Sequence, residues 1–251
     1  MGLSPYWVDL HMHTVLSPCG ELEMGAPEIA EAYRSAGIAL CAVTDHNAAD
    51  NAPAVAWAAS GDPVVLAGME VQSSEDIHVV VLFPDFDGAR EYQRWLWEAM
   101  PPTQNRPDIF GDQLIIDGEN SILDEQEILL IQGVGYSVDE VAQQAMDMGA
   151  IVIPAHLDRP SFSYEAGLGP VPSDFPCHAL ELSPAVSHAD FRTWRERYPD
   201  RVFLRSSDAH RLSGISRDRC TVMMLEKPSF TEILLALANR DGRSVISPWG
   251  D

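Results

Sequence analysis

The stretch Val8-Asp9-Leu10-His11-Met12-His13-Thr14 places two histidines two residues apart at the end of a short apolar run. If this run is a β-strand, alternate side chains point to the same side, so the imidazoles of His11 and His13 face one direction. Two imidazoles that converge in this way can bind one metal ion. An isolated pair of this kind is equally compatible with two surface histidines, so its interpretation depends on the rest of the chain.

Apolar runs that are typical of buried strands recur along the chain, and helical patterns separate several of them. The runs 38–44 (IALCAVT) and 150–155 (AIVIPA) are continuous, as expected for strands that are buried on both faces. We predict strands at 6–13, 38–44, 63–68, 77–83, 150–155, 179–182, 201–205 and 220–225, and helices at 27–37, 52–59, 89–100, 137–149, 191–198 and 229–240. This α/β alternation predicts a single domain over residues 1–251, with a parallel sheet of about seven strands closed as a TIM-like barrel.

The segment 101–135 is less regular than the rest of the chain. It holds a predicted hairpin around Asp117-Gly118 and an acidic stretch at 124–127. Irregular segments of this length inside a domain are usually functional or mobile. We therefore expect an insertion, or a lid over the site, between the fourth strand and the helix at 137–149.

The charge balance of the chain is strongly acidic. Its 38 acidic and 16 basic residues give a net charge of −22, and Lys227 is the one lysine. Phosphate backbones are bound by surplus lysine and arginine, so we expect general nucleic-acid binding to be unlikely, although a local basic pocket remains compatible with this balance. No apolar run reaches the roughly 18–20 residues of a membrane span, and the N-terminus lacks signal-peptide features. We expect a soluble cytoplasmic protein with no membrane partner.

Histidines and acidic residues gather at the ends of the predicted strands. A barrel would bring these ends to one rim, where reactive residues of such folds stand. Imidazole suits Zn, Fe and Mn, and carboxylates can bridge two ions. The set exceeds the needs of one metal and predicts two or three divalent ions (Zn, Fe or Mn). Its members are His11, His13, His46, Glu70, His78, His156, Asp208 and His210, whereas His178 and His188 lie in no motif.

Taken together, the motifs DLHMHT (9–14), TDHN (44–47), PAH (154–156) and SDAH (207–210), with Glu70 between them, resemble those of the PHP (polymerase and histidinol phosphatase) phosphoesterases. The resemblance implies a distorted seven-stranded (β/α) barrel with a trinuclear site for Zn, Mn or Fe. It also implies a grouping of ligands, in which the His78 match rests on spacing alone. The first metal would be bound by His11, His13 and Asp208, and Glu70 would bridge it to another metal. His46 and His156 would bind a second ion. His78 and His210 would complete the site of the third.

The loop after the first motif departs from the family pattern. Many PHP proteins have histidine or aspartate there, whereas this chain has Cys19. A thiolate is a good ligand for Zn or Fe and a poor one for Mg or Mn. Either Cys19 is a metal ligand, which would favour Zn or Fe, or the second metal loses a ligand. Glu21 or Glu23 could substitute for it, and a bystander cysteine is the remaining alternative.

The expected chemistry follows from the metals. A metal cluster can lower the pKa of a bridging water and clamp phosphoryl oxygens, so we predict hydroxide between the metals as the nucleophile. Asp45 and Asp9 are expected to orient ligating histidines as hydrogen-bond acceptors. Arg159 and Arg211, which follow His156 and His210, are expected to hold the substrate phosphate, since arginine suits bidentate phosphate contacts.

Three functions fit these observations. The leading one is a metal-dependent phosphoesterase acting on a small phosphorylated molecule or nucleotide. A non-catalytic PHP module with a regulatory or structural role is an alternative, which the complete ligand set disfavours. The third is hydrolysis of a C–N or other bond on a similar barrel. Some related barrels use a carboxylated lysine for this, and Lys227 lies far from any strand-end motif.

Overall fold

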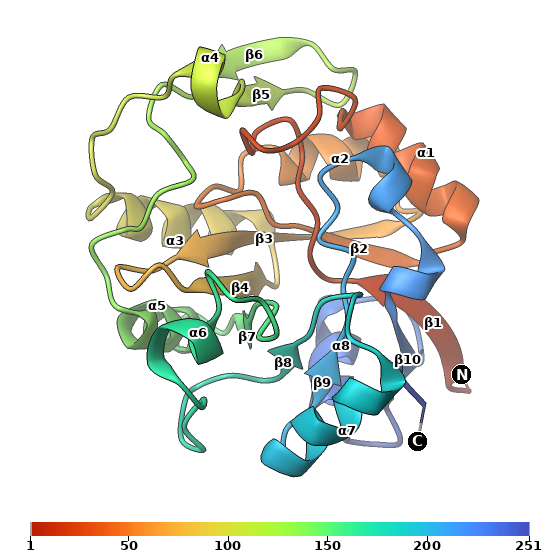
Figure 1. The fold of residues 1–251 in the computed structure, drawn as a ribbon. Coiled ribbons are helices and arrows are strands. Elements are labelled where there is room, and N and C mark those ends of the chain that lie inside the picture. The colour runs from red at the N-terminus through yellow and green to blue at the C-terminus, as the bar shows by residue number, and fades with distance from the viewer. Residues whose placement is uncertain (1, 251) are drawn as a thin grey trace.

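The structure, a computed structural model, describes residues 2–250 and contains a main sheet of seven strands (Figure 1). Their order is β11-β10-β1-β2-β3-β4-β7, and the sheet curls as a half-barrel. The strands are β1 (Ser4–Asp9), β2 (Leu40–Val43), β3 (Val64–Gln72), β4 (His78–Phe83), β7 (Ile151–Pro154), β10 (Thr221–Leu225) and β11 (Ser244–Ile246). A separate parallel pair consists of β8 (Leu180–Glu181) and β9 (Phe203–Leu204).

The α/β class is confirmed, but the expectation of an entirely parallel sheet is wrong. Strands β1, β2 and β3 are parallel, whereas β4 runs antiparallel to β3 and β7, and β10 runs antiparallel to β1. The reason lies in the connection between β3 and β4, which consists of residues 73–77 alone. A parallel crossover takes a dozen or more residues, so this short connection allows only a hairpin.

The predicted helices are all present, with local signals at several ends. Helix α1 has Pro27 in its first turn and ends at Gly37 (φ +64°), a left-handed position that glycine adopts without strain. Ser137 and Glu140 form the expected capping box of α5. Within residues 2–250, every helix is too short or too polar to cross a bilayer. The helices are α1 (Ala26–Ala36), α2 (Ala52–Ala59), α3 (Phe86–Trp97), α4 (Pro107–Phe110), α5 (Val138–Asp147), α6 (Tyr164–Leu168), α7 (His188–Arg197) and α8 (Phe230–Leu237), with 3-10 turns η1 (Leu212–Gly214) and η2 (Arg217–Arg219).

Both faces of the main sheet are buried, which explains the continuous apolar runs. In β2, Cys41 and Val43 belong to the cluster that includes side chains of α1, α2, α3 and α5. Leu40 and Ala42 alternate with them and belong to a second cluster, which includes side chains of β10 and α8. A strand enclosed in this way needs apolar residues at every position.

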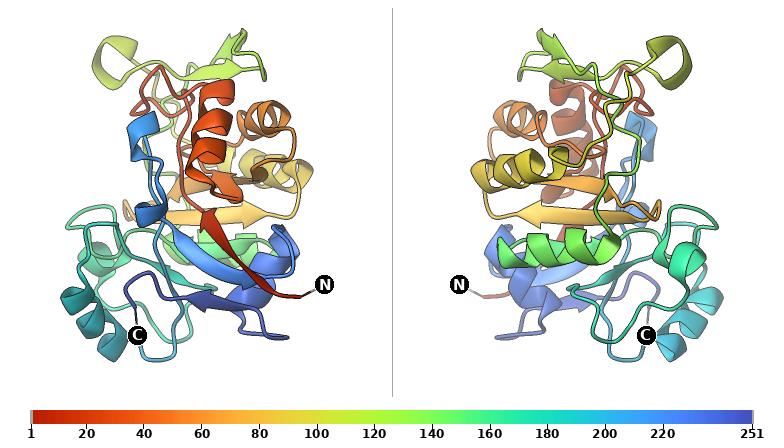
Figure 2. Two further views of the ribbon diagram at one scale, coloured as in Figure 1. Left: turned by 90° about the vertical axis from the view of Figure 1, so that its right-hand side faces the viewer. Right: turned by 90° about the vertical axis from the view of Figure 1, so that its left-hand side faces the viewer.

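The segment 101–135 forms local structure rather than one long loop. It contains α4 and the hairpin of β5 (Leu114–Ile116) and β6 (Ile122–Glu125), which turns at Asp117-Gly118 as expected. Figure 2 shows this hairpin at one end of the molecule and α7 at the other. Asn51 donates to the carbonyl of Leu114 (2.9 Å), and Asn47 donates to that of Leu130 (2.7 Å). These bonds tie the segment to the region that follows β2.

Candidate metal centre

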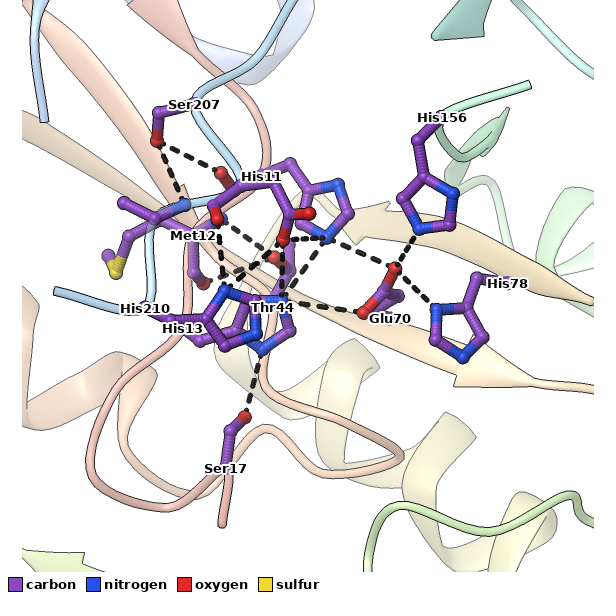
Figure 3. Close-up of polar contacts among 12 residues, drawn as sticks. His11, Met12, His13, Ser17, Thr44, Glu70, His78, His156, Ser207 and His210 are labelled. Atoms are coloured by element: carbon purple, nitrogen blue, oxygen red, sulfur yellow. Dashed lines mark hydrogen bonds and ion pairs between the residues drawn. The ribbon is translucent and has the colours of Figure 1, made fainter. Parts of the chain in front are cut away.

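Loops that follow the strand ends carry most of the candidate ligands (Figure 3). His11 and His13 lie just beyond β1, and His46 lies just beyond β2. Isolated bridges extend the sheet past these ends: Met12 pairs with Ala209, and His46 pairs with Glu70. The pairing holds the loop of Asp208 and His210, which follows β9, against the loop of His11 and His13.

His78 reaches the same edge from the opposite direction. It is the first residue of β4, and it pairs with Gln72 at the end of β3. Because β4 is antiparallel, its beginning lies where the parallel strands end. The Nδ1 atom of His78 is 2.8 Å from Oε1 of Glu70.

The carboxylate of Glu70 is the centre of the cluster, and the residue is only 1% exposed. Burial alone would raise its pKa, but the surrounding histidines, His78 and His11 foremost, lower the pKa well below the ordinary value. Its Oε1 contacts His78, His156 (3.0 Å to Nε2) and His11 (3.3 Å to Nε2), and its Oε2 contacts His46 (3.1 Å to Nδ1) and His13 (3.4 Å to Nε2).

Asp208 supplies a second carboxylate beside the first. Its Oδ1 lies 3.2 Å from Nε2 of His13 and 3.4 Å from Nε2 of His11. Asp208 (φ +47°) and His156 (φ +30°) both have backbones in the left-handed region. Such conformations cost non-glycine residues about 1–3 kcal/mol each, and they cluster at functional sites. The surrounding fold therefore holds these two side chains in place against local preference.

The donor set fits divalent metal ions. Three groups of residues each bring one ligand atom per residue together, and within each group these atoms lie within 4.8 Å of one another. The groups are His13, His46 and His210; His11, His13 and Glu70; and His46, Glu70 and His78. Among residues 2–250, the buried atoms Nε2 of His78 and Nδ1 of His156 have no hydrogen-bond partner. Buried polar atoms without partners are costly, and bound ions would satisfy them. Imidazole and carboxylate donors suit Zn, Fe or Mn.

The grouping of ligands differs in part from the one that the motifs implied. His78 lies with His46 and Glu70, and His210 lies with His13 and His46, so these two do not share one of the three groups. Cys19 belongs to none of them among residues 2–250. The residue as a whole is exposed and lines a cavity with His210, whereas surrounding protein partly desolvates its thiol. This desolvation, together with the charges of Glu70 and Asp208, raises the pKa of the thiol.

The histidines of the centre differ in protonation. Burial would lower the pKa of His13, but hydrogen bonding to Asp208 and Glu70 outweighs it and raises this pKa to about 9. The pKa of His11 is raised as well, because burial is outweighed by the charges of Glu181 and Glu70. Burial lowers the pKa of His46, and it lowers that of His210 to about 4. The carboxylates that raise the pKa of His11 and His13 are thus the same groups whose charge divalent cations would neutralise.

Glu181 and Ser17 support the ligands and were not expected from the sequence. Oε1 of Glu181 lies 3.0 Å from Nδ1 of His11 and accepts from the backbone N–H of His156 (3.2 Å). The hydroxyl of Ser17 lies 2.9 Å from Nδ1 of His13. Ligating histidines usually bond a second group through the other ring nitrogen. Glu181 ends the short strand β8, so the strand-end rule that selected Glu70 could have found it.

Asp45 and Asp9 act one step further from the ligands than expected. Asp45 accepts from the hydroxyl of Ser17 (2.7 Å) and from the N–H and hydroxyl of Thr14 (2.7 Å each), so it reaches His13 through Ser17. Asp9 accepts from the N–H of Ser207 (2.9 Å), next to Asp208. Both carboxylates are fully buried, and they hold the loops that carry ligands.

Three arginines lie around the centre. Nη2 of Arg159 forms an ion pair with Oδ2 of Asp208 at 2.5 Å, and the arginine side chain remains 42% exposed. Arg211 lines a cavity of about 310 Å³ with Cys19, Asp208 and His210. The sequence indicated both of these arginines. Arg219, which lines the same cavity, was not expected.

Comparison with known sequences yields one distant relative. No protein-family model matches the chain. The uncharacterized protein YqxK of Bacillus subtilis (strain 168) is 27% identical over 198 residues, which is 74% of this chain and 44% of that protein. The chain therefore spans less than half the length of this relative.

Solved structures of similar fold include a DNA-binding enzyme. The lesion-specific endonuclease Q of Pyrococcus furiosus superposes with a TM-score of 0.67 at 18% identity, over 97% of this chain and 58% of that one. Another endonuclease Q structure contains a 27-mer duplex substrate with an abasic lesion at the active site. It superposes with a TM-score of 0.66 at 18% identity, over 97% of this chain and 59% of that one.

The expectation that nucleic-acid binding is unlikely is therefore wrong. Endonuclease Q, of which 59% superposes on this chain, binds a duplex substrate. Net charge describes the whole surface, whereas contact with a phosphate backbone depends on local charge, to which bound metal cations contribute.

Two further structures carry the fold in other hydrolases. An amidohydrolase from Chromobacterium violaceum has a TM-score of 0.54 at 16% identity over 96% of this chain and 98% of that one. A two-domain protein from Bacteroides vulgatus, which contains a predicted PHP-like metal-dependent phosphoesterase, has a TM-score of 0.53 at 14% identity over 95% of this chain and 64% of that one. The structural neighbours of this chain thus include the PHP-like metal-dependent phosphoesterases that its motifs resemble.

Proposed function

We propose that this chain is a metal-dependent hydrolase of phosphoester bonds. The observation that carries the proposal is the buried carboxylate of Glu70, which five histidine rings contact within 3.4 Å. Asp208 adds a second carboxylate that faces His11 and His13. A purely structural site would need few ligands, whereas this set is large enough for more than one divalent ion.

The residues that would hold metal ions are those of the three groups above, together with His156 and Asp208. Bound divalent ions would supply Lewis-acid chemistry and a lowered pKa for a coordinated water. Glu181 and Ser17 fix the rings of His11 and His13, so that Nε2 of each ring faces the carboxylates. Arg159 keeps part of its guanidinium exposed beside Asp208, where it can donate to a phosphoryl oxygen.

Phosphoester chemistry is favoured over amide hydrolysis by the arginines. Arg159 contacts Asp208 directly, and Arg211 shares a cavity with Asp208 and His210. Guanidinium groups match the geometry of phosphate oxygens and serve less well for a neutral amide. Nucleic acids belong among the substrates to be tested, because the structural neighbour endonuclease Q binds a duplex substrate.

The test begins with the metal content of the purified protein. After chelation, the protein is reloaded with Zn, Mn or Fe and assayed with p-nitrophenyl phosphate, bis-p-nitrophenyl phosphate, labelled oligonucleotides and a panel of amides. We expect two or three ions per chain and cleavage of at least one phosphoester. His13→Ala should lower both metal content and hydrolysis, the latter at least 100-fold, while His188→Ala, which changes an exposed histidine on α7, should alter neither.

Two results would reject the proposal. Full metal loading without hydrolysis of any phosphoester would favour a non-catalytic module. Cleavage of amides alone would favour the amidohydrolase alternative. Circular dichroism of His13→Ala separates loss of metal from loss of fold.

A further inference from the structure

Two cavities adjoin at the metal centre. One of about 520 Å³ is lined by residues that include Arg159, Ser183 and Asp218. The other, of about 310 Å³, is lined by residues that include Cys19 and Arg211. Asp208 and Arg219 line both cavities, so the two cavities meet at these residues, and the side chain of Asp208 is itself 5% exposed.

Arg219 stands where the two cavities meet, and its charge interacts with that of Asp218, which lines the larger cavity beside it. It ends the turn η2 and is exposed. Within residues 2–250, no hydrogen bond or ion pair is formed by the guanidinium of Arg219 or by that of Arg211. Asp218, its neighbour in sequence, accepts a hydrogen bond from the hydroxyl of Ser216.

The acidic groups that face these cavities are mostly engaged. Asp158 accepts from the N–H and hydroxyl of Ser183 (2.7 and 2.6 Å). Asp208 is paired with Arg159 and faces His11 and His13. Glu21 in the smaller cavity and Asp218 in the larger one are the remaining carboxylates. An anionic ligand would therefore meet Arg211 directly and would compete with Asp218 for the charge of Arg219.

We infer that the substrate is a nucleic-acid strand cleaved at an internal phosphodiester, and that Arg219 binds a phosphate next to the scissile one. The inference rests on the proposed function. A phosphomonoester has an organic group on one side only, and a single cavity of a few hundred Å³ would hold it. A phosphodiester has groups on both sides, which matches two cavities that meet at Asp208 and Arg219.

Hydrolysis of this bond needs only water as co-reactant. The oxygen of water forms a bond to phosphorus, and the bond from phosphorus to one sugar oxygen breaks. The leaving oxygen takes a proton and becomes a hydroxyl, so one product ends in a phosphate monoester and the other in an alcohol. The two products then lie in different cavities.

The kinetic test compares substrates that differ in length. We expect Arg219→Ala to raise KM for a labelled single-stranded oligonucleotide about tenfold. The same variant should raise KM for bis-p-nitrophenyl phosphate by no more than about twofold. Arg219→Lys should recover part of the loss, because it keeps the charge without the bidentate fork. Arg240→Ala, which removes an exposed arginine that lines neither cavity, should leave both values within twofold of wild type.

A binding test that needs no catalysis uses the chelated protein. Fluorescence anisotropy with a labelled 12-mer should give a linear fall of log K with log salt concentration. Each phosphate contact to a single strand contributes about 0.7 to that slope, so Arg219→Ala should reduce it by about 0.7 and Arg240→Ala should not. An unchanged slope in Arg219→Ala would overturn the role of Arg219.

The failures of the two proposals are distinguishable. If the wild type hydrolyses monoesters but leaves every oligonucleotide intact, the proposed function stands and the strand substrate is rejected. If it hydrolyses no phosphoester at all, the proposed function itself fails. If Arg219→Ala raises KM by the same factor for the oligonucleotide and for bis-p-nitrophenyl phosphate, this arginine does not bind the neighbouring phosphate.

Discussion

Glu181 Oε1 lies 3.0 Å from Nδ1 of His11, and both side chains are buried. The opposite ring nitrogen of His11 faces Glu70 at 3.3 Å and Asp208 at 3.4 Å. Glu181 thus fixes the orientation of the ring and lets Nε2 face the place where metal would bind. The charge of His11 in turn keeps the pKa of Glu181 below its ordinary value, despite burial, which raises it.

Replacing Glu181 with glutamine should weaken metal binding without unfolding the protein. Loss of such a supporting carboxylate typically costs 10–100-fold in metal affinity. We expect Glu181→Gln to fall in this range in competition titrations with a chromogenic chelator. Glu196→Gln, at an exposed position on α7, is the control and should bind metal as wild type does. Equal affinities in the two variants would contradict the role of Glu181.

Glu70 should determine how many ions the chain holds. It contacts five histidines, so its loss affects ligands from all sides of the centre. Glu70→Gln keeps the shape but removes the negative charge, and we expect fewer ions per chain by elemental analysis and at least 100-fold slower hydrolysis. A variant that still carries the wild-type number of ions would show that Glu70 is not a bridging ligand.

Ser17 should stabilise the fold as well as the centre. Its buried hydroxyl donates a hydrogen bond to Asp45. The oxygen of this hydroxyl contacts Nδ1 of His13 and accepts from the backbone N–H of His46. Ser17→Ala removes one of the hydrogen bonds of Asp45 and leaves Nδ1 of His13 and the N–H of His46 without this partner, which costs about 1–3 kcal/mol in the free energy of unfolding. The control is Ser35→Ala, where an exposed hydroxyl donates to Glu31, and it should change stability by at most about 0.5 kcal/mol. Denaturant unfolding of the metal-free forms measures both, and equal effects would contradict the prediction.

Metal affinity should depend on pH through His13. Its pKa of about 9 in the metal-free protein means that the ring is protonated at pH 7. A metal ion requires the neutral imidazole, so binding at pH 7 must displace this proton, and apparent affinity should rise as pH increases from 7 to 9. Calorimetry in buffers of different ionisation enthalpy would detect the released proton. Affinity that is constant over this range would show that His13 does not bind the metal.

Much of the fold was predictable because its signals are local. The capping box of Ser137 and Glu140 and the left-handed Gly37 mark helix ends through contacts a few residues apart. Continuous apolar runs identified strands that are buried on both faces. The strand-end rule also selected the histidines and acids that the structure brings together around Glu70.

What the sequence determined by itself, then, was the set of chemical groups and the elements that carry them, because residue type and local periodicity are written in neighbouring positions. Only the tertiary structure decided that β4 turns back antiparallel and so delivers His78 from its first residue to the edge where other strands end. The same holds for Glu181 behind His11 and for Arg219 between two cavities. These relationships join residues far apart in the chain, and no local pattern encodes a distance between them.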